Sequence, residues 1–361
     1  MAASRSVAAF ELAAAPESAL RVERVEDAAA AEWDAYVSAH AEASAYHSYA
    51  WRAVIRKVFG HETHYLCVRD QDGLQGVLPL VRLKSALFGD FMVSLPYFNY
   101  GGVLATHARA RDALLQSAAD LARSLGVSHV ELRHRSAQQS QWPARTDKVA
   151  MLLNLPAAGE SIDKILPSKL RSQVKRPVRE GAQCVFGSLD LLDEFYAVFA
   201  QNMRDLGTPV YSKSFFRTIL QTFPERAWIA IVRLHNAPVA AALLLDHRDT
   251  VEIPWASSLQ RVNKLGVNMF LYWNVLQRAA SRGCRVFDFG RSTLDGGTFR
   301  FKRQWGAQPL QLHWHYWLAA GGDLPRMNPD NPKYRLAVAA WRKLPLAAAN
   351  WLGPHIVGKL P

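Results

Sequence analysis

A segment near the C-terminal end, Phe287–Trp305, concentrates residue types that can position a substrate and move a proton. Asp288 alternates with apolar neighbours, so its carboxylate points to the opposite face of a strand from them. Arg291 follows at the strand end, and a Gly-Gly turn brings Lys302 back towards it. An acid beside several bases fits a proton acceptor within a substrate-positioning site. We predict three catalytic residues, Asp288, Arg291 and Lys302, and two substrate-binding residues, Ser292 and Trp305.

A purely structural interpretation of this segment stays open. Asp288 and Arg291 can form a buried ion pair that fastens the strand to its loop, because such pairs are costly to break. Lys302 can equally be a surface charge, and Trp305 can be a packing aromatic.

Further candidate binding residues lie around a chain break and at a strand end. Asn202, Arg204 and Tyr211 flank a Gly-Thr-Pro break that follows a helical pattern, and such loops often carry ligand contacts. Arg204 can clamp a carboxylate or phosphate, or it can cap the helix. Trp255, after Pro254, lines a cleft or belongs to the core. The aromatic segment 96–102 forms the opposite cleft wall or a hydrophobic bend.

The positive charge of this 361-residue chain is unevenly distributed. The net charge is +12, and residues 1–150 hold 16 Lys and Arg against 16 Asp and Glu, so the whole excess lies in residues 151–361. The densest stretch, Ile162–Glu180, predicts an amphipathic helix that Pro177 ends or kinks. We predict that its bases bind an anionic substrate, although a solvated basic face is the alternative. These bases are Lys169, Arg171, Lys175 and Arg176.

An internal repeat predicts the architecture. Residues 61–81 and 225–245 both follow a strand, turn, strand pattern, and residues 114–134 and 271–291 both follow a helix, glycine, strand pattern. The second pair aligns Gly126 with Gly283 and Glu131 with Asp288. Two tandem α/β domains, each a mixed sheet with flanking helices, follow from this order. We expect an N-terminal extension at 1–19, domains at 20–150 and 151–320, and a C-terminal helical tail at 321–361.

Composition limits the class of protein. Half the residues are hydrophobic and a fifth are charged, which indicates a globular chain, and no apolar run is long enough to span a bilayer. The first twenty residues lack a secretory pattern, so we expect a cytoplasmic protein. Three scattered cysteines predict neither a disulfide framework nor a metal site, and the pairs His61/His64 and His313/His315 are not expected to bind metal.

Several ordered segments resemble the FemAB-like proteins and, more narrowly, the branch associated with exosortase/PEP-CTERM exopolysaccharide systems. Together they place the resemblance over about residues 20–358. The segments are Trp33–Trp51, Leu166–Gly181, Asn202–Ser212, Phe287–Gly306 and Asn331–Gly358.

The resemblance implies two GNAT-type acyltransferase folds and transfer of an aminoacyl or acyl group to an amine of a peptidoglycan or exopolysaccharide precursor. The donor is then aminoacyl-tRNA or acyl-CoA, and no resident cofactor is expected. The GNAT pyrophosphate motif is only partly present in Leu259–Met269, where Asn268 replaces the second glycine, and this departure weakens the case for CoA. Asn268, at the start of the following helix, remains a candidate binding residue. No Ser or Cys nucleophile with a partner His is visible, which favours direct transfer.

Two other functions remain open at this point. A non-catalytic RNA-binding protein can use the basic second domain, and a membrane-associated scaffold of an export system can use the tail. The tail, Tyr334–Leu360, carries tryptophans, leucines and bases, so it either lies on the inner membrane surface or clamps the two domains together.

Overall fold

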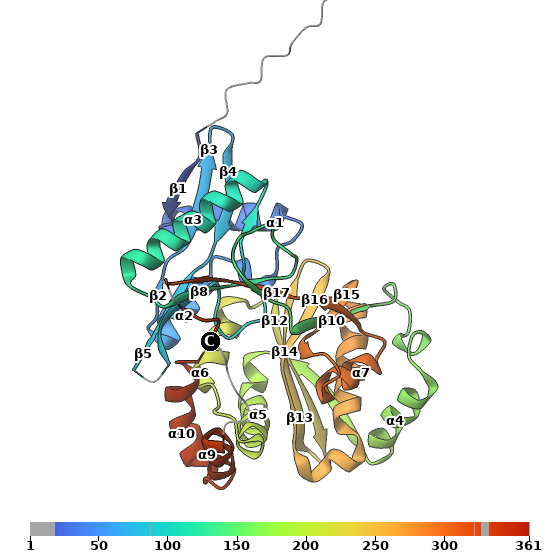
Figure 1. Cartoon of the computed structure of the whole chain (residues 1–361). Coiled ribbons are helices and arrows are strands. Elements are labelled where there is room, and N and C mark those ends of the chain that lie inside the picture. The colour runs from blue at the N-terminus through green and yellow to red at the C-terminus, as the bar shows by residue number, and fades with distance from the viewer. Residues whose placement is uncertain (1–18, 87, 321, 326–331, 361) are drawn as a thin grey trace, which may run out of the picture.

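The computed structural model describes residues 19–86, 88–320, 322–325 and 332–360. Two α/β halves lie one above the other in Figure 1, with α3 and β1 in the upper half and α4, α7 and β13 in the lower half. The predicted fold class, mixed sheets with flanking helices, is confirmed. The predicted N-terminal extension lies outside the described residues except for residue 19.

The first half alternates short strands with three α-helices among its described residues. The strands are β1 (Arg21–Arg24), β2 (Glu62–Thr63), β3 (Leu66–Asp70), β4 (Gly73–Leu78), β5 (Val81–Ser85), β6 (Gly89–Val93), β7 (Leu104–Ala105), β8 (His129–His134) and β9 (Ala144–Arg145). The helices are α1 (Ala30–Ala39), α2 (Trp51–Phe59) and α3 (Ala108–Leu125), with a short 3₁₀ turn at Ala45–His47.

The second half has longer strands, and the tail is helical. The strands are β10 (Lys148–Asn154), β11 (Ala182–Gly187), β12 (Ala227–Leu234), β13 (Ala237–His247), β14 (Thr250–Ser258), β15 (Val286–Thr293), β16 (Gln308–Gln311) and β17 (His313–Leu318). The helices are α4 (Ser168–Arg179), α5 (Leu192–Leu206), α6 (Lys213–Thr222), α7 (Val267–Ser281), α8 (Gly297–Arg303), α9 (Pro332–Arg342) and α10 (Leu346–Val357).

The strands form three sheets, and one strand changes halves. The orders are β1-β3-β4-β7, β2-β5-β6-β8-β17-β9 and β11-β12-β13-β14-β15-β10-β16. Strand β17 lies within the predicted second domain, yet it pairs antiparallel with β8, from His313 opposite His134 to Leu318 opposite His129. Strand β10 begins at Lys148, before the predicted boundary, and already pairs with β15. The sheet of the first half therefore includes a strand from the C-terminal end of the predicted second domain.

The predicted repeat appears element by element. Strands β3 and β4 correspond to β12 and β13, helix α3 to α7, and β8 to β15. Gly126 and Gly283 end the two helices with φ of 66° and 81°, a left-handed conformation that glycine adopts at little cost. In both halves the strand after the helix runs parallel to an earlier strand, β8 with β6 and β15 with β14. Glu131 and Asp288 occupy equivalent positions in these ladders, opposite Val93 and Glu252.

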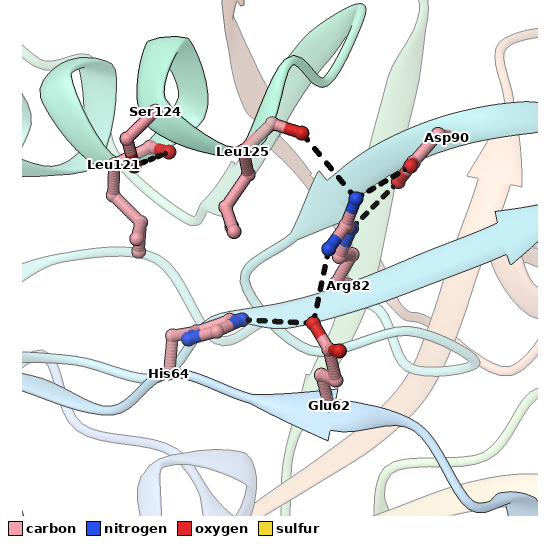
Figure 2. A network of polar contacts seen from close by, with 7 residues as sticks. All are labelled: Glu62, His64, Arg82, Asp90, Leu121, Ser124 and Leu125. Atoms are coloured by element: carbon pink, nitrogen blue, oxygen red, sulfur yellow. Dashed lines mark hydrogen bonds and ion pairs between the residues drawn. The ribbon is translucent and has the colours of Figure 1, made fainter.

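A polar network holds the edge of the first half together (Figure 2). Arg82 on β5 donates two hydrogen bonds to Asp90 on β6, at 2.8 and 2.7 Å, and a third of 3.2 Å to Glu62 on β2. The same guanidinium reaches the carbonyl of Leu125 at the end of α3, at 3.3 Å. The Arg82 charge holds the pKa of Asp90 below its usual value. The network therefore joins three strands to the helix that covers them.

One hydrophobic core extends across both halves, and two further clusters lie in the first half. Aromatic rings from the first half contact rings of the second, with centroids 4.7 Å apart for Trp51 and Phe223 and 5.7 Å apart for Phe98 and Trp255. Burial of such rings contributes about 2–3 kcal/mol each, so the contact between the halves is strongly stabilised.

The basic helix is α4, and Pro177 lies inside its last turn. The helix continues to Arg179, two residues beyond the predicted break, and buries Leu170, Val174 and Pro177. Because proline has no amide hydrogen, the carbonyl of Gln173 receives no helical bond from it. That carbonyl faces Gly266 at the start of α7, only 3.5 Å from where a Cβ would stand. Helix α4 thus packs along α7, next to its first turn.

The tail clamps the two halves, as one of the two sequence interpretations predicts. Helices α9 and α10 pack on α5, and a Cβ on Gly353 would lie 2.7 Å from the amide nitrogen of Val210. At its end, the Gly358 carbonyl accepts a hydrogen bond from Tyr97 of the first half, at 2.8 Å, and lies 2.8 Å from His61 Nε2. The tail therefore spans from the second half to the first.

The described part of the chain has no helix long and apolar enough to cross a bilayer. Cys67, Cys184 and Cys284 are free thiols, and Cys67 and Cys284 are buried. Within the same residues, no cluster of three or more His, Cys, Asp or Glu side chains could hold a metal ion.

Candidate functional site

The candidate site begins where two parallel strands separate. Strands β14 and β15 pair only from Thr250 opposite Val286 to Glu252 opposite Asp288. Beyond that point β14 continues to Ser258 and β15 to Thr293 without pairing to each other. Two carboxylates therefore face each other at the last paired position.

Residues of the first half close over these carboxylates. Tyr100 donates a hydrogen bond of 2.7 Å to Asp288 Oδ2, and the amide of Gly290 donates one of 2.7 Å to Asp288 Oδ1. Asn99 donates a 3.0 Å bond to Glu252 Oε1. The hydroxyl of Tyr46 is buried and interacts with the Glu252 carboxyl group. We call Glu252, Asp288, Tyr46, Asn99 and Tyr100 the carboxylate cluster.

Burial makes these carboxyl groups hold protons more tightly than usual. The pKa of Glu252 is raised to about 8, first by desolvation and then by the charge of Asp288. Desolvation also raises the pKa of Asp288, opposed by the Tyr100 hydrogen bond and by the charge of Arg135. The charge of Asp288 opposes ionisation of Glu252, because two neighbouring buried carboxyl groups cannot both be charged at low cost. A base that titrates near the working pH is well suited to proton transfer.

This shift predicts a pH dependence of stability. Glu252 has an ordinary pKa of 4.5 and a folded-state pKa of about 8, so the folded chain keeps a proton that the unfolded chain has released. The bases with lowered pKa values do not reverse this trend. For the buried histidines, stability rises with pH only up to their ordinary pKa of 6.5. For Lys302, whose pKa is lowered to about 8, stability rises with pH only above 8. From pH 6.5 to 8 we therefore expect the wild-type Tm to fall. Thermal melts of Glu252→Gln over that range should show a smaller fall, and an equal fall in both proteins would contradict the shift.

The carboxylate at the equivalent position of the first half has a positively charged partner. Glu131 is buried, but Arg133 Nε donates to it at 2.6 Å and the Tyr316 hydroxyl at 2.9 Å. In the repeat, Arg133 corresponds to Gly290, which lacks a side chain and has φ of 73°. Among the described residues, no arginine forms an ion pair with Asp288, whereas Arg133 pairs with Glu131. The first half neutralises its carboxylate, whereas the second half keeps one that can exchange a proton.

The three predicted catalytic residues lie close together, with different roles. Lys302 is 8% exposed, and its ammonium donates to the carbonyls of Gly290 and Arg291 at 3.0 and 2.8 Å. Its interpretation as a surface charge is therefore wrong. The predicted alternative of an Asp288–Arg291 ion pair does not form. Arg291 instead places its guanidinium 4.7 Å from the Trp314 ring centroid, beside Arg133 at 4.4 Å from the same ring.

The predicted binding residues of the Gly-Thr-Pro region separate into two groups. Tyr211 and Trp255 lie together, with ring centroids 6.1 Å apart, and Tyr211 also contacts Tyr97 of the first half. Burial raises the pKa of Tyr211 to about 12, against the charges of Arg133 and Arg291. Arg204 turns away from this group, because it donates to the Leu344 carbonyl of the tail and pairs with Asp205.

The remaining predicted residues are dispersed. Asn202 on α5 donates to Ser257 on β14 at 3.0 Å. Ser292 is buried with its hydroxyl unpaired among the described residues. Trp305 is fully buried against Tyr272, as a packing aromatic. Asn268 lies half-buried in the first turn of α7. Four exposed bases lie on α4, namely Lys169, Arg171, Lys175 and Arg176.

Sequence reasoning did not identify Glu252, Tyr46 or Arg135. Glu252 carries a recognisable signal, since it is a lone acid in the otherwise apolar run Val251–Trp255. The aromatic segment 96–102, for which the sequence allows a cleft wall or a core bend, supplies part of the site through Asn99 and Tyr100.

Part of the chain matches a known protein family. Residues 168–303 match the family model described as "Acetyltransferase (GNAT) domain", which includes Glu252, Asp288 and Lys302. No curated protein sequence gives a significant match.

Solved structures show the same fold over nearly the whole chain. A crystal structure of FemX aligns with a TM-score of 0.61 at 15% identity, covering 88% of this chain and 100% of FemX. The structure of L-PGS from Bacillus licheniformis gives 0.54 at 12%, covering 90% and 99%. A tandem GNAT protein from the clavulanic acid biosynthesis pathway gives 0.51 at 13%, covering 85% and 100%.

The second half of the chain thus carries a region that matches an acetyltransferase (GNAT) domain. The whole-chain architecture is similar to that of tandem GNAT proteins.

Proposed function

We propose that the protein transfers an aminoacyl or acyl group directly onto an amine of a cell-envelope precursor, with the carboxylate cluster accepting the amine proton. The observation that carries this proposal is the buried pair of Glu252 and Asp288, which lacks the arginine that neutralises Glu131. The pair stands where β14 and β15 separate, within the GNAT domain.

The chemistry needs a deprotonated amine, a stabilised oxyanion and two substrates held together. Once Glu252 has lost its own proton, its carboxylate can accept one from an attacking ammonium. Burial lowers the pKa of Lys302 to about 8, so its ammonium group is charged at pH 7 and loses its charge as the pH rises through 8. It lies beside the Gly290 and Arg291 carbonyls, so it orients the end of β15 and offers charge to the developing oxyanion.

The basic face of α4 and the first turn of α7 are proposed to hold the anionic donor. A helix N-terminus and nearby lysines and arginines both favour phosphate groups. Aminoacyl-tRNA is the donor we favour over acyl-CoA, since the pyrophosphate motif is incomplete at Asn268 and the sequence segments resemble the FemAB-like proteins.

The acceptor is proposed from the sequence resemblance. An amine on a peptidoglycan or exopolysaccharide precursor, the latter within an exosortase/PEP-CTERM system, fits the branch that the segments resemble. Such precursors are lipid-linked, and Leu336 and Trp351 of the tail are 72% and 70% exposed, which suits a peripheral contact with the inner membrane surface.

Mass spectrometry can test the reaction. The protein is incubated with charged tRNA or with acyl-CoA pools, plus a cell-envelope extract, and new amides are sought. A new amide that needs only one donor pool identifies the donor. RNA binding without any amide would favour a non-catalytic RNA-binding protein instead.

Neutralising the basic face of α4 is expected to weaken tRNA binding at least 10-fold at low salt. Exchanging Lys169, Arg171, Lys175 and Arg176 for Gln removes four positive charges proposed to face phosphates, so binding should also become less sensitive to salt. Filter binding across a salt series measures both effects. Arg56→Gln with Lys57→Gln, exposed bases on α2, is the matched control and should bind as the wild type does. Equal losses of affinity in the two variants would contradict a role for α4.

A further inference from the structure

A cavity of about 270 Å³ lies between the two halves, next to the turn that joins β13 to β14. The first half lines it with Asp34 and Ser38 of α1 and with Ser48, and the second half with Arg226, His247 and Arg248. It holds the volume of about nine liquid waters, enough for a small ligand. None of its lining residues belongs to the carboxylate cluster.

Arg226 has hydrogen-bond donors in this cavity that no described residue accepts from. Its Nε donates to the Asp246 carbonyl at 3.0 Å, and its two terminal nitrogens donate to no described residue. Burial lowers the pKa of Arg226, although the charges of Asp34 and Asp246 oppose this shift. The terminal nitrogens are therefore available to donate to a ligand in the cavity.

His247 adds a second unused group. Its Nε2 is buried and has no hydrogen-bond partner among the described residues. Burial, followed by the charges of Arg226, Arg248 and Arg135, lowers the pKa of His247 to about 4. The ring is therefore neutral at pH 7, with one N–H that can be donated.

Arg248 supplies a fixed positive charge at the cavity wall. Its φ of 54° is unusual for a residue with a side chain, and its NH2 group donates to the carbonyls of Val37, Ser38 and His40 at the end of α1. These bonds hold the guanidinium between the two halves. Asp34 is the single carboxylate among the lining residues, and its Oδ1 already accepts a bond from the Tyr49 amide.

We propose that this cavity binds a small oxyanion, a phosphate or a carboxylate group, that bridges the two halves. Two permanent cations, a neutral imidazole N–H and two serine hydroxyls face one partly satisfied carboxylate. This excess of donors matches a ligand that carries only acceptors. Since the ligand contacts α1 and the β13–β14 turn together, its binding stabilises the contact between the halves.

Calorimetry and thermal melting of the full chain test the proposal, with inorganic phosphate and acetate as separate probes in NaCl of constant ionic strength. We expect saturable binding of at least one probe and a rise in Tm of about 3 °C at 100 times its Kd. The tighter probe identifies the group that the site prefers. The absence of saturable binding of both probes would overturn the proposal.

Two variants assign the binding to the cavity. Arg226→Gln and His247→Leu should each weaken the tighter probe at least 10-fold, whereas Arg217→Gln, an exposed base on α6, should bind like the wild type. If Arg226→Gln lowers the Tm too far for calorimetry, His247→Leu decides, because it removes no charge from the neutral ring. Unchanged binding in both cavity variants would overturn the proposal, and neither result depends on acyl transfer.

Discussion

Replacing Glu252 by glutamine is expected to lower kcat about 100- to 1,000-fold with little change in KM. Glutamine keeps the size of the side chain and can still accept the hydrogen bond from Asn99, but it cannot take a proton. Steady-state rates of amide formation measure the effect. The Tm should not fall, because the exchange removes a buried ionisable group.

The pH profile separates the two carboxylates. The wild-type kcat/KM should rise with pH through an apparent pKa near 8, since Glu252 must lose its proton to act as a base. Asp288→Asn removes a charge that raises the pKa of Glu252, so the rise should move to lower pH, whereas Glu252→Gln should abolish it. Glu194→Gln, which removes a carboxylate paired with Arg233 on the surface of α5, is the control and should keep the wild-type rate. A wild-type rate in Glu252→Gln would remove this residue from the mechanism.

Replacing Arg133 by methionine is expected to lower the free energy of unfolding by about 3–5 kcal/mol. Glu131 would remain buried with only the Tyr316 hydroxyl as a partner, and a buried charge without its counter-charge is costly. Arg133 also donates to the Phe98 carbonyl at 2.5 Å, next to Asn99, so the carboxylate cluster should loosen and kcat should fall. Urea denaturation and steady-state rates measure the two effects.

A double variant separates charge from packing. Adding Glu131→Gln to Arg133→Met removes the orphaned charge, so most of the lost stability should return. Activity should recover less, because the bond to Phe98 stays absent. If the double variant is no more stable than the single one, the charge pair is not what Arg133 contributes.

Local patterns predicted the repeat well. Gly126 and Gly283 end amphipathic helices, and apolar strands follow both, because helix periodicity and glycine caps are properties of neighbouring residues. The alternation of Asp288 with Phe287 and Phe289 likewise placed its side chain on the opposite face of the strand from theirs. It could not predict that β17 pairs with β8, since strand partners far apart in sequence leave no local signal.

The candidate site was predicted only in part for the same reason. Asp288 and Lys302 lie 14 positions apart and were grouped from one segment. Glu252 and Tyr100 come from other elements, and only their contacts bring them to Asp288. The sequence allows Arg204 to bind an anion, but in the structure its guanidinium donates to the Leu344 carbonyl of the tail.

The amino-acid sequence by itself determined the element order, the duplication and the basic character of the second half, because each depends on residue type and short-range spacing. The tertiary structure alone decided which groups surround each carboxylate. Glu131 and Asp288 occupy equivalent strand positions, and the sequence places Arg133 two residues after the first and Gly290 two residues after the second. The burial of Asp288 beside Glu252 and the hydrogen bond from Tyr100 of the first half are long-range contacts, which no local pattern encodes.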